Sequence, residues 1–283
     1  MPADRCGGHS HRVRDPRPQP ALFHGPGAHA AVVVWRARDG VSTAFLRMRA
    51  TALIDRSVLV AIAPPLLDAH EREALPAERV LPRAHAGRTM PSTRGSVLVQ
   101  IASDERDGLI EALRRADALL GTIADRDEEI EGGWPHDRRE PFGFREPRVP
   151  THDDVRAALV HEGPLEGATF LLHQRYVQHR ARFFARREAD RERVVGRTTE
   201  GVAISDAPQR AHVRRVHQHA MVRRGFPYRA WGDEGLVYVA IARAPEIFEQ
   251  TLDAMLGARD GITDAMLDYV EAIGGGLYVV PPL

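Results

Sequence analysis

Runs of apolar residues along the chain predict a series of buried strands. Six runs are rich in Val, Ile, Leu and Ala and are bounded by turn residues, which is typical of strands. The predicted strands cover 30–37, 57–63, 96–103, 169–177, 235–242 and 276–280. The runs at 30–37 and 57–63 are typical of buried strands.

Apolar residues at helical spacing predict five helices between these strands. The clearest helix follows the third strand, and its apolar stripe consists of Leu109, Ile110, Leu113, Ala116 and Leu120. The other predicted helices cover 66–75, 180–195, 245–256 and 263–272. Pro76 ends the helix at 66–75, and Pro245 suits the first position of the helix at 245–256.

Two stretches lack this periodicity. Residues 1–27 are rich in Pro, Gly and Arg and are predicted to form a loose N-terminal arm. Residues 125–150 carry charge, Gly and Pro and are predicted to form a long loop, which serves either as a functional loop or as a plain linker. We therefore expect an N-terminal half over 28–150, ending in this loop, and a C-terminal half over 151–283.

The two halves show an internal repeat. The segment VLVQIA at 97–102 matches VYVAIA at 237–242, at an offset of 140 residues, and a predicted helix follows each segment. Any two buried strands share such a pattern, so the match also arises without a repeat. The repeat predicts an α+β fold with two ferredoxin-like halves and a ligand cleft between them.

Composition narrows the classes of function. Basic and acidic residues both number 39, so the formal net charge is zero, which argues against nucleic acid or an anionic membrane as the partner. All basic residues are Arg, and Lys and Asn are absent, which excludes lysine Schiff-base chemistry and a phosphate-loop lysine. Cys6 is the only cysteine, so intrachain disulfides and cysteine-held zinc or iron–sulfur sites are excluded. Without a signal-peptide pattern or an apolar run of about 20 residues, the protein is expected to be cytoplasmic.

One region is dense in residues that carry chemistry. His212 is followed by Arg214 and Arg215, and Arg197 and Arg223 lie within 15 residues of it. A single imidazole among cations suits haem, whose iron takes an axial nitrogen and whose propionates pair with Arg. The spacing alone favours a solvent-exposed face of arginines instead.

Other motifs are absent or weak. The chain has no GxSxG segment and no GxGxxG segment that follows a strand, so neither a serine hydrolase nor a dinucleotide-binding unit is indicated. Two histidine pairs, His9 with His11 and His217 with His219, have a spacing seen in metal sites but lack a third ligand.

Several segments occur in the order found in dye-decolourising peroxidases, a haem-dependent family that the chain resembles from about residue 55 onward. They are PSTRGS at 91–96, PFGF at 141–144, VVGRT at 194–198, AHVRR at 211–215, VRRG at 222–225 and VEAIGGGLYVVPP at 270–282. Each segment is unspecific alone, but six in this order are not. The resemblance implies two ferredoxin-like halves of the dimeric α+β barrel type around a haem cleft.

The resemblance also implies roles for particular residues. His212 matches the family's haem-iron ligand and Arg223 its distal arginine, while Arg197 falls where the family has a cation near a haem propionate. Glu146 takes the place of the Asp in the family's Gly-x-x-Asp-Gly loop, and Pro147 replaces the second Gly. Glu has a reference pKa close to that of Asp and transfers protons as well. Its extra methylene moves the carboxylate, however, and a misplacement of about 1 Å costs on the order of 100-fold in rate.

The function implied by the resemblance is that of a peroxidase with heme b, which reduces hydrogen peroxide and oxidises a small organic reductant, either dye-like or phenolic. A haem carrier or sensor without efficient peroxide cleavage is the first alternative, because of the change at Glu146. A cofactor-free structural protein on the same fold is the second, which the short first half allows. The sequence leaves open whether the protein is a homo-oligomer and which Trp or Tyr carries electrons.

A ligating histidine usually donates its second ring N–H to an acceptor. The predicted helix at 263–272 carries three acidic residues, and we expect Asp268 to be the acceptor for His212. The alternative is that this helix presents a solvent-exposed acidic face. Arg214 and Arg215 are expected to point to solvent or to a propionate, because guanidinium does not coordinate iron.

Overall fold

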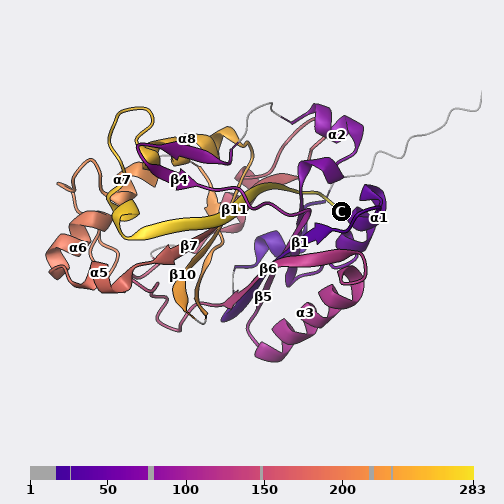
Figure 1. Ribbon diagram of the computed structural model, residues 1–283, viewed down its shortest axis with the longest axis horizontal. Coiled ribbons are helices and arrows are strands. Elements are labelled where there is room, and N and C mark those ends of the chain that lie inside the picture. The colour runs from indigo at the N-terminus through magenta and orange to yellow at the C-terminus, as the bar shows by residue number, and fades with distance from the viewer. Residues whose placement is uncertain (1–16, 26, 76–79, 147–148, 217–219, 231) are drawn as a thin grey trace, which may run out of the picture.

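The computed structural model describes residues 17–25, 27–75, 80–146, 149–216, 220–230 and 232–283 (Figure 1). The helices, with 3-10 turns labelled η, are η1 (Pro20–Phe23), α1 (Thr43–Thr51), η2 (Pro64–Leu66), α2 (Ala69–Glu73), α3 (Arg106–Leu120), α4 (His152–Ala157), α5 (Arg180–Phe184), α6 (Glu188–Val195), α7 (His212–Val216), α8 (Glu246–Leu256) and η3 (Ala265–Asp268). The strands are β1 (His29–Ala37), β2 (Val58–Ile62), β3 (Arg83–His85), β4 (Arg88–Met90), β5 (Val97–Ser103), β6 (Ala124–Gly132), β7 (Thr169–Gln178), β8 (Val222–Arg223), β9 (Phe226–Ala230), β10 (Asp233–Ala242) and β11 (Val270–Val280).

The main sheet is antiparallel and closes on itself. Its strands follow the order β7-β11-β2-β5-β1-β6-β9-β10-β8, and β10 also pairs with β7. Strands from the two parts of the chain meet where β6 pairs with β9 and where β11 pairs with β2. The predicted α+β fold with ferredoxin-like halves is therefore confirmed, while the boundary at residue 150 stays a prediction.

The strands bury both faces, which explains their continuous apolar runs. In β1, Val32 and Val34 point into the closed sheet, where they pack with Leu98 and Val239. Val33 points outward into a second core beneath the helices. That outer core includes residues of α1, α3 and α8. Figure 1 shows α1 and α3 at one end of the molecule and α5, α6 and α7 at the other.

The predicted loop at 125–150 is wrong over its first part, which forms β6. This strand pairs with β1 along its length, although only Ala124 and Ile130 in it are buried. Asp125 and Asp127 face outward and form ion pairs with arginines of or next to β1 at 2.7 and 2.5 Å, whereas Glu128 points inward to the buried His173 at 2.9 Å. The sequence pattern did not predict this strand because most of its residues are charged. The strand forms because it pairs with β1.

The predicted helix at 263–272 is also wrong. Only the 3-10 turn η3 forms there, and β11 already begins at Val270. Pairing with β7 carries the strand through Gly274–Gly276, and a side chain at Gly275 would lie 2.4 Å from the carbonyl oxygen of His173. Two further predicted helices are shorter or divided: 66–75 becomes η2 and α2, and 180–195 becomes α5 and α6.

The described part of the N-terminal arm, residues 17–25, is packed rather than loose. Gln19 is fully buried, and its side chain exchanges hydrogen bonds with the backbone of Val60 at 2.9 and 3.0 Å. It also donates to the carbonyl oxygen of Pro281 at 2.9 Å. The prediction of a loose arm is therefore wrong for this segment, and residues 1–16 and 26 lie outside the described residues.

Arg224 ties this segment to the sheet and provides a test of its packing. Its guanidinium donates to the carbonyl oxygens of Leu22 and Ala21 at 2.6 and 2.7 Å, and burial lowers the pKa of Arg224 to about 10. We expect Arg224→Met to lower the free energy of unfolding by about 3 kcal/mol, because both carbonyl oxygens would stay buried without a donor. Urea unfolding measures this change. The exposed Arg229 on β9 gives the control, since Arg229→Met should cost less than about 0.5 kcal/mol; equal losses would contradict the role of Arg224.

Candidate active site

A cavity of about 520 Å³ lies on the outer face of β7 and β10, beside α7 and α8. Alternate residues of β7 line it, and apolar side chains of α8 form another wall. Its lining includes His212, Glu146, Arg223 and Arg197, so the fold brings together four of the five residues predicted for the site. We call this space the main cavity.

His212 begins α7 and is held by a buried carboxylate. Its Nδ1 lies 2.7 Å from an oxygen of Asp264, and the Asp264 side chain is fully buried. The other oxygen of Asp264 accepts the N–H of Met266 at 2.8 Å, which fixes the carboxylate at the start of η3. Nε2 of His212 makes no hydrogen bond within the described part of the chain. The arrangement leaves that nitrogen available as a ligand.

The prediction that Asp268 accepts from His212 is wrong, because Asp264 does so. The carboxylate of Asp268 pairs with Arg88 and, at 2.8 Å, with Arg210. Both acids lie in the same turn, but the predicted helix would have placed them differently from the 3-10 turn that forms. Of the three acidic residues on the predicted helix, the sequence analysis selected the wrong carboxylate.

The arginines that follow His212 anchor its helix. Arg215 is buried, donates to the carbonyl oxygen of Ala254 at the end of α8 and forms a two-pronged ion pair with Asp260 at 2.8 Å. Arg214 donates to the carbonyl oxygen of Ser205 at 2.7 Å. The expectation that Arg215 faces solvent or a propionate is wrong, since its guanidinium is used to fix α7 against α8.

A short hairpin over 138–146 places Glu146 on the cavity wall. Arg139 and Arg145 form a backbone bridge within it, and the N–H of Glu146 donates to the carbonyl oxygen of Arg138 at 2.8 Å. Residue 147, the proline that departs from the family's loop, lies outside the described residues. The position of Glu146 is set by this backbone pairing.

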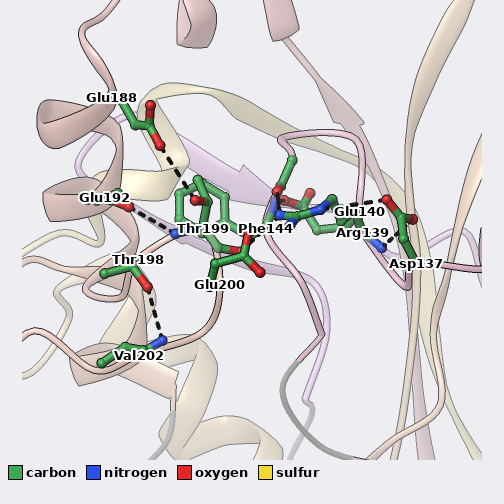
Figure 2. A network of polar contacts seen from close by, with 11 residues as sticks. Asp137, Arg139, Glu140, Phe144, Glu188, Glu192, Thr198, Thr199, Glu200 and Val202 are labelled. Atoms are coloured by element: carbon green, nitrogen blue, oxygen red, sulfur yellow. Dashed lines mark hydrogen bonds and ion pairs between the residues drawn. The ribbon is translucent and has the colours of Figure 1, made fainter.

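A polar network supports the hairpin from the side of α6 (Figure 2). The guanidinium of Arg139 donates to the carbonyl oxygens of Gly143 and Thr199 at 2.8 and 3.1 Å and pairs with Glu200. The N–H of Thr199 in turn donates to Glu192 of α6 at 2.9 Å. The turn that follows α6 thereby fixes the hairpin from outside the cavity.

Arg197 and Arg223 add positive charge to the same wall. Burial lowers the pKa of Arg197, and the nearby Arg223 adds to this effect, whereas the carboxylates of Glu146 and Glu140 oppose it. Arg223 donates to the carbonyl oxygen of Val216, the last residue of α7, at 2.8 Å. Arg197 thus lies in one electrostatic cluster with Glu146, and its place beside a propionate stays a prediction.

Glu140 is a cavity residue that the sequence reasoning missed. Its carboxylate accepts the N–H groups of Phe142 and Phe144 at 3.0 and 3.2 Å and the side-chain amide of Gln178 at 3.2 Å. Burial raises the pKa of Glu140, and these hydrogen bonds offset that rise only in part. The signal in the sequence is a Glu directly before the PFGF segment. The wall therefore carries Glu140 as well as Glu146.

The remaining candidates from the sequence gain no support. Over the described residues, no group of three or more His, Cys, Asp or Glu side chains could hold a metal ion. The pairs His9/His11 and His217/His219 lie outside those residues. No helix among them is long and apolar enough to cross a membrane, and the location of the protein in the cell stays a prediction.

Comparison with known proteins places the chain in a class. Residues 143–283 match the family model described as Dyp-type peroxidase, C-terminal. The dye-decolorizing peroxidases of Mycobacterium tuberculosis and Mycolicibacterium paratuberculosis are 26% and 28% identical to the chain over 212 residues. These matches cover 69% and 68% of this chain but 63% and 59% of the relatives, so the chain spans less than two thirds of their length.

Solved structures share the whole fold. The dye-decolorizing protein from V. cholerae has a TM-score of 0.82 and 25% identity, over 93% of this chain and 96% of that one. DyPB from Rhodococcus jostii RHA1 has a TM-score of 0.81 and 25% identity, over 93% and 95%. A variant of the Rhodococcus protein was solved in complex with heme. The closed α+β sheet of this chain is thus the fold of dye-decolorizing proteins. The chain belongs to the DyP-type peroxidase family.

Proposed function

We propose that this protein is a peroxidase that binds heme b in the main cavity, reduces hydrogen peroxide and oxidises small dye-like or phenolic reductants. One observation carries the proposal: a single cavity holds Glu146, Arg223 and His212, and the His212 ring is engaged by Asp264 at one nitrogen only. Membership of the family and the relative with bound heme support the same cofactor.

The residues of the main cavity fit haem. Its volume of about 520 Å³ lies within the range of about 300–1,000 Å³ usual for cofactor pockets. Apolar side chains suit the porphyrin faces: Leu172, Leu236, Phe248, Leu252 and Met255. Arginines on the wall suit its propionates. Nε2 of His212 would hold the iron.

Haem, when bound, supplies the redox centre of the reaction. Two phenol molecules each lose one electron and one proton, and hydrogen peroxide gains two of each to become two molecules of water. Glu146 takes a proton from one peroxide oxygen and delivers it to the other. Arg223 stabilises negative charge on the departing oxygen without itself transferring a proton.

A haem carrier or sensor is the second candidate. Glu146 stands where the family has Asp, and the guanidinium of Arg223 donates to the carbonyl oxygen of Val216. Both features would slow peroxide cleavage while leaving His212 able to hold haem.

The test has two stages. Titration of the purified protein with haemin, followed by absorption, should end at one haem per chain. Hydrogen peroxide and a phenol added to the loaded protein should then give oxidised phenol at a rate well above that of free haemin. Failure to bind haemin would overturn the proposal and leave the cofactor-free alternative. Binding without turnover would overturn the peroxidase and favour the carrier.

Asp264 offers an independent check on how haem is held. Asp264→Asn should weaken haem binding by about 10- to 100-fold, because the carboxylate orients the His212 ring and raises its basicity. Haemin titration measures the affinity, and Asp268→Asn is the matched control, expected to leave it within about twofold. An equal loss in both variants would contradict the role of Asp264.

A further inference from the structure

Trp134 and Arg138 form a pair on the wall of the main cavity that the proposed reaction does not use. We propose that this pair is a subsite for a planar aromatic reductant that carries a carboxylate. The inference rests on the proposed function and names the class of its reductant. The indole would stack against the aromatic ring of the reductant, and the guanidinium of Arg138 would bind its carboxylate.

Trp134 is held in a fixed place by its backbone and by its ring nitrogen. Its indole N–H donates to the carbonyl oxygen of Gly225 at 3.0 Å. The preceding Gly133 donates to the carbonyl oxygen of Pro227 at 3.0 Å and has a φ of +154°. A side chain at Gly133 would lie 1.9 Å from the carbonyl oxygen of Ala28, so only glycine fits there. The indole is therefore presented to the cavity by a close-packed backbone.

Arg138 has no acidic partner among the residues that the structure describes. Its guanidinium lies over the Trp134 ring, 5.1 Å from the ring centre, and its Nε is buried with no hydrogen-bond acceptor. Within the described ranges of the chain, no carboxylate lies within 4 Å of this guanidinium, whereas the neighbouring Arg139 pairs with Asp137 and Glu200. A cation left this way next to an aromatic face is a site for an anion on a flat ligand.

The backbone of Arg138 keeps this cation beside the reaction site. Its φ is +54°, a left-handed conformation that costs a residue with a side chain about 1 kcal/mol or more. The same residue accepts the N–H of Glu146 through its carbonyl oxygen at 2.8 Å. Arg138 and Glu146 are therefore paired at the two ends of one hairpin, and a ligand bound to the Arg138 guanidinium would lie close to Glu146.

The other charged groups of the wall differ from Arg138. The buried Nε of Arg197 also lacks a hydrogen-bond acceptor, but Arg197 lies in the field of Glu140 and Glu146, and Arg223 donates to a backbone carbonyl. Asp154, the remaining acid on the wall, accepts both the N–H and the hydroxyl of Thr151 at 2.8 Å. Among the wall arginines of the described residues, Arg138 is the one whose guanidinium lies over an aromatic ring.

A carboxylate on the Arg138 guanidinium has two sources, a reductant or a haem propionate, and the experiment separates them. The probes are 4-hydroxycinnamate and its uncharged methyl ester, titrated calorimetrically into the haem-loaded protein and also used as reductants with peroxide. Arg138→Gln should raise both Kd and KM for the acid at least tenfold and leave those for the ester within about twofold, with kcat unchanged. Arg138→Lys should restore most of the affinity for the acid, and Trp134→Leu should weaken binding of both probes.

Arg145→Gln is the matched control, because it removes an exposed arginine from the same hairpin outside the cavity and should change neither probe. Equal shifts for acid and ester, or none, would overturn the subsite. A loss of haemin affinity of tenfold or more in Arg138→Gln, with unchanged discrimination between the probes, would assign the guanidinium to a propionate and overturn it too. If calorimetry distinguishes the acid from the ester but the protein does not turn over peroxide, the subsite is supported and the proposed peroxidase activity is rejected. If the protein turns over peroxide but does not distinguish the two probes, the peroxidase activity is supported and the subsite is rejected.

Discussion

The His212→Ala variant is expected to lose stoichiometric haem binding. His212 lies on the lining of the main cavity, and its ring is oriented by the buried Asp264. Alanine offers no nitrogen to the iron, and the porphyrin would retain only apolar contacts and the pairing of its propionates with arginine. In a haemin titration, the sharp end point at one haem per chain should disappear, and the absorption spectrum should resemble that of loosely bound haemin.

Two other histidines follow in the sequence and provide the comparison. His217→Ala and His219→Ala should each bind haemin as the parent does, because the resemblance to the family and the Asp264 contact both single out His212. Loss of binding in either of these variants, with binding retained in His212→Ala, would show that the alignment across 211–225 is displaced. Circular dichroism of each variant separates loss of the ligand from loss of the fold.

Arg223→Leu is expected to reduce peroxide turnover more than Glu146→Gln does. Arg223 carries a permanent charge and stabilises a developing anion, and removal of one such donor costs about 100- to 1,000-fold in other enzymes. Glu146→Gln loses proton transfer but keeps a polar group that positions water, so its loss should be smaller. The measurement is kcat/KM for hydrogen peroxide with a phenol in excess.

Controls must separate charge from structure at Arg223, because its guanidinium also donates to the end of α7 through Val216. Arg223→Lys keeps the charge and should recover part of the activity, and haemin affinity should stay within about threefold of the parent in all variants. Equal turnover in the parent and both variants, close to that of free haemin, would show that neither residue acts on peroxide. The carrier would then be the better description.

The elements that the sequence predicted most clearly are present in the fold, and each was predicted from the residues of the element itself. The buried strands, α3 and α8 were found because their apolar residues recur at the spacing of the element itself. The order of six short segments indicated the family. His212, Glu146, Arg197 and Arg223, which are far apart in the sequence, all line the main cavity. These residues were accessible to sequence reasoning because the chemistry restricts which residue types can stand there.

The errors fall where a distant partner decides the conformation. β6 is a strand with a charged outer face, and it forms because β1 pairs with it. β11 begins early because it pairs with β7 from Val270 onward, so the predicted helix at 263–272 does not form. In the turn that forms instead, Asp264 rather than Asp268 contacts His212. The packed segment around Gln19 depends on backbone groups of β2 and of residue 281.

The sequence by itself determined the class of fold, the family and the residue types available for chemistry, since these follow from periodicity, composition and short motifs. Only the tertiary structure decided which carboxylate orients His212, that Glu140 shares a wall with Glu146, and that Arg138 lies over Trp134 with no acidic partner in the described part of the chain. The physical reason is that each of these contacts joins groups whose neighbourhood is set by strand pairing and by loop conformation. Hydrogen bonds and ion pairs act over about 3–4 Å, a distance that spacing along the chain does not specify.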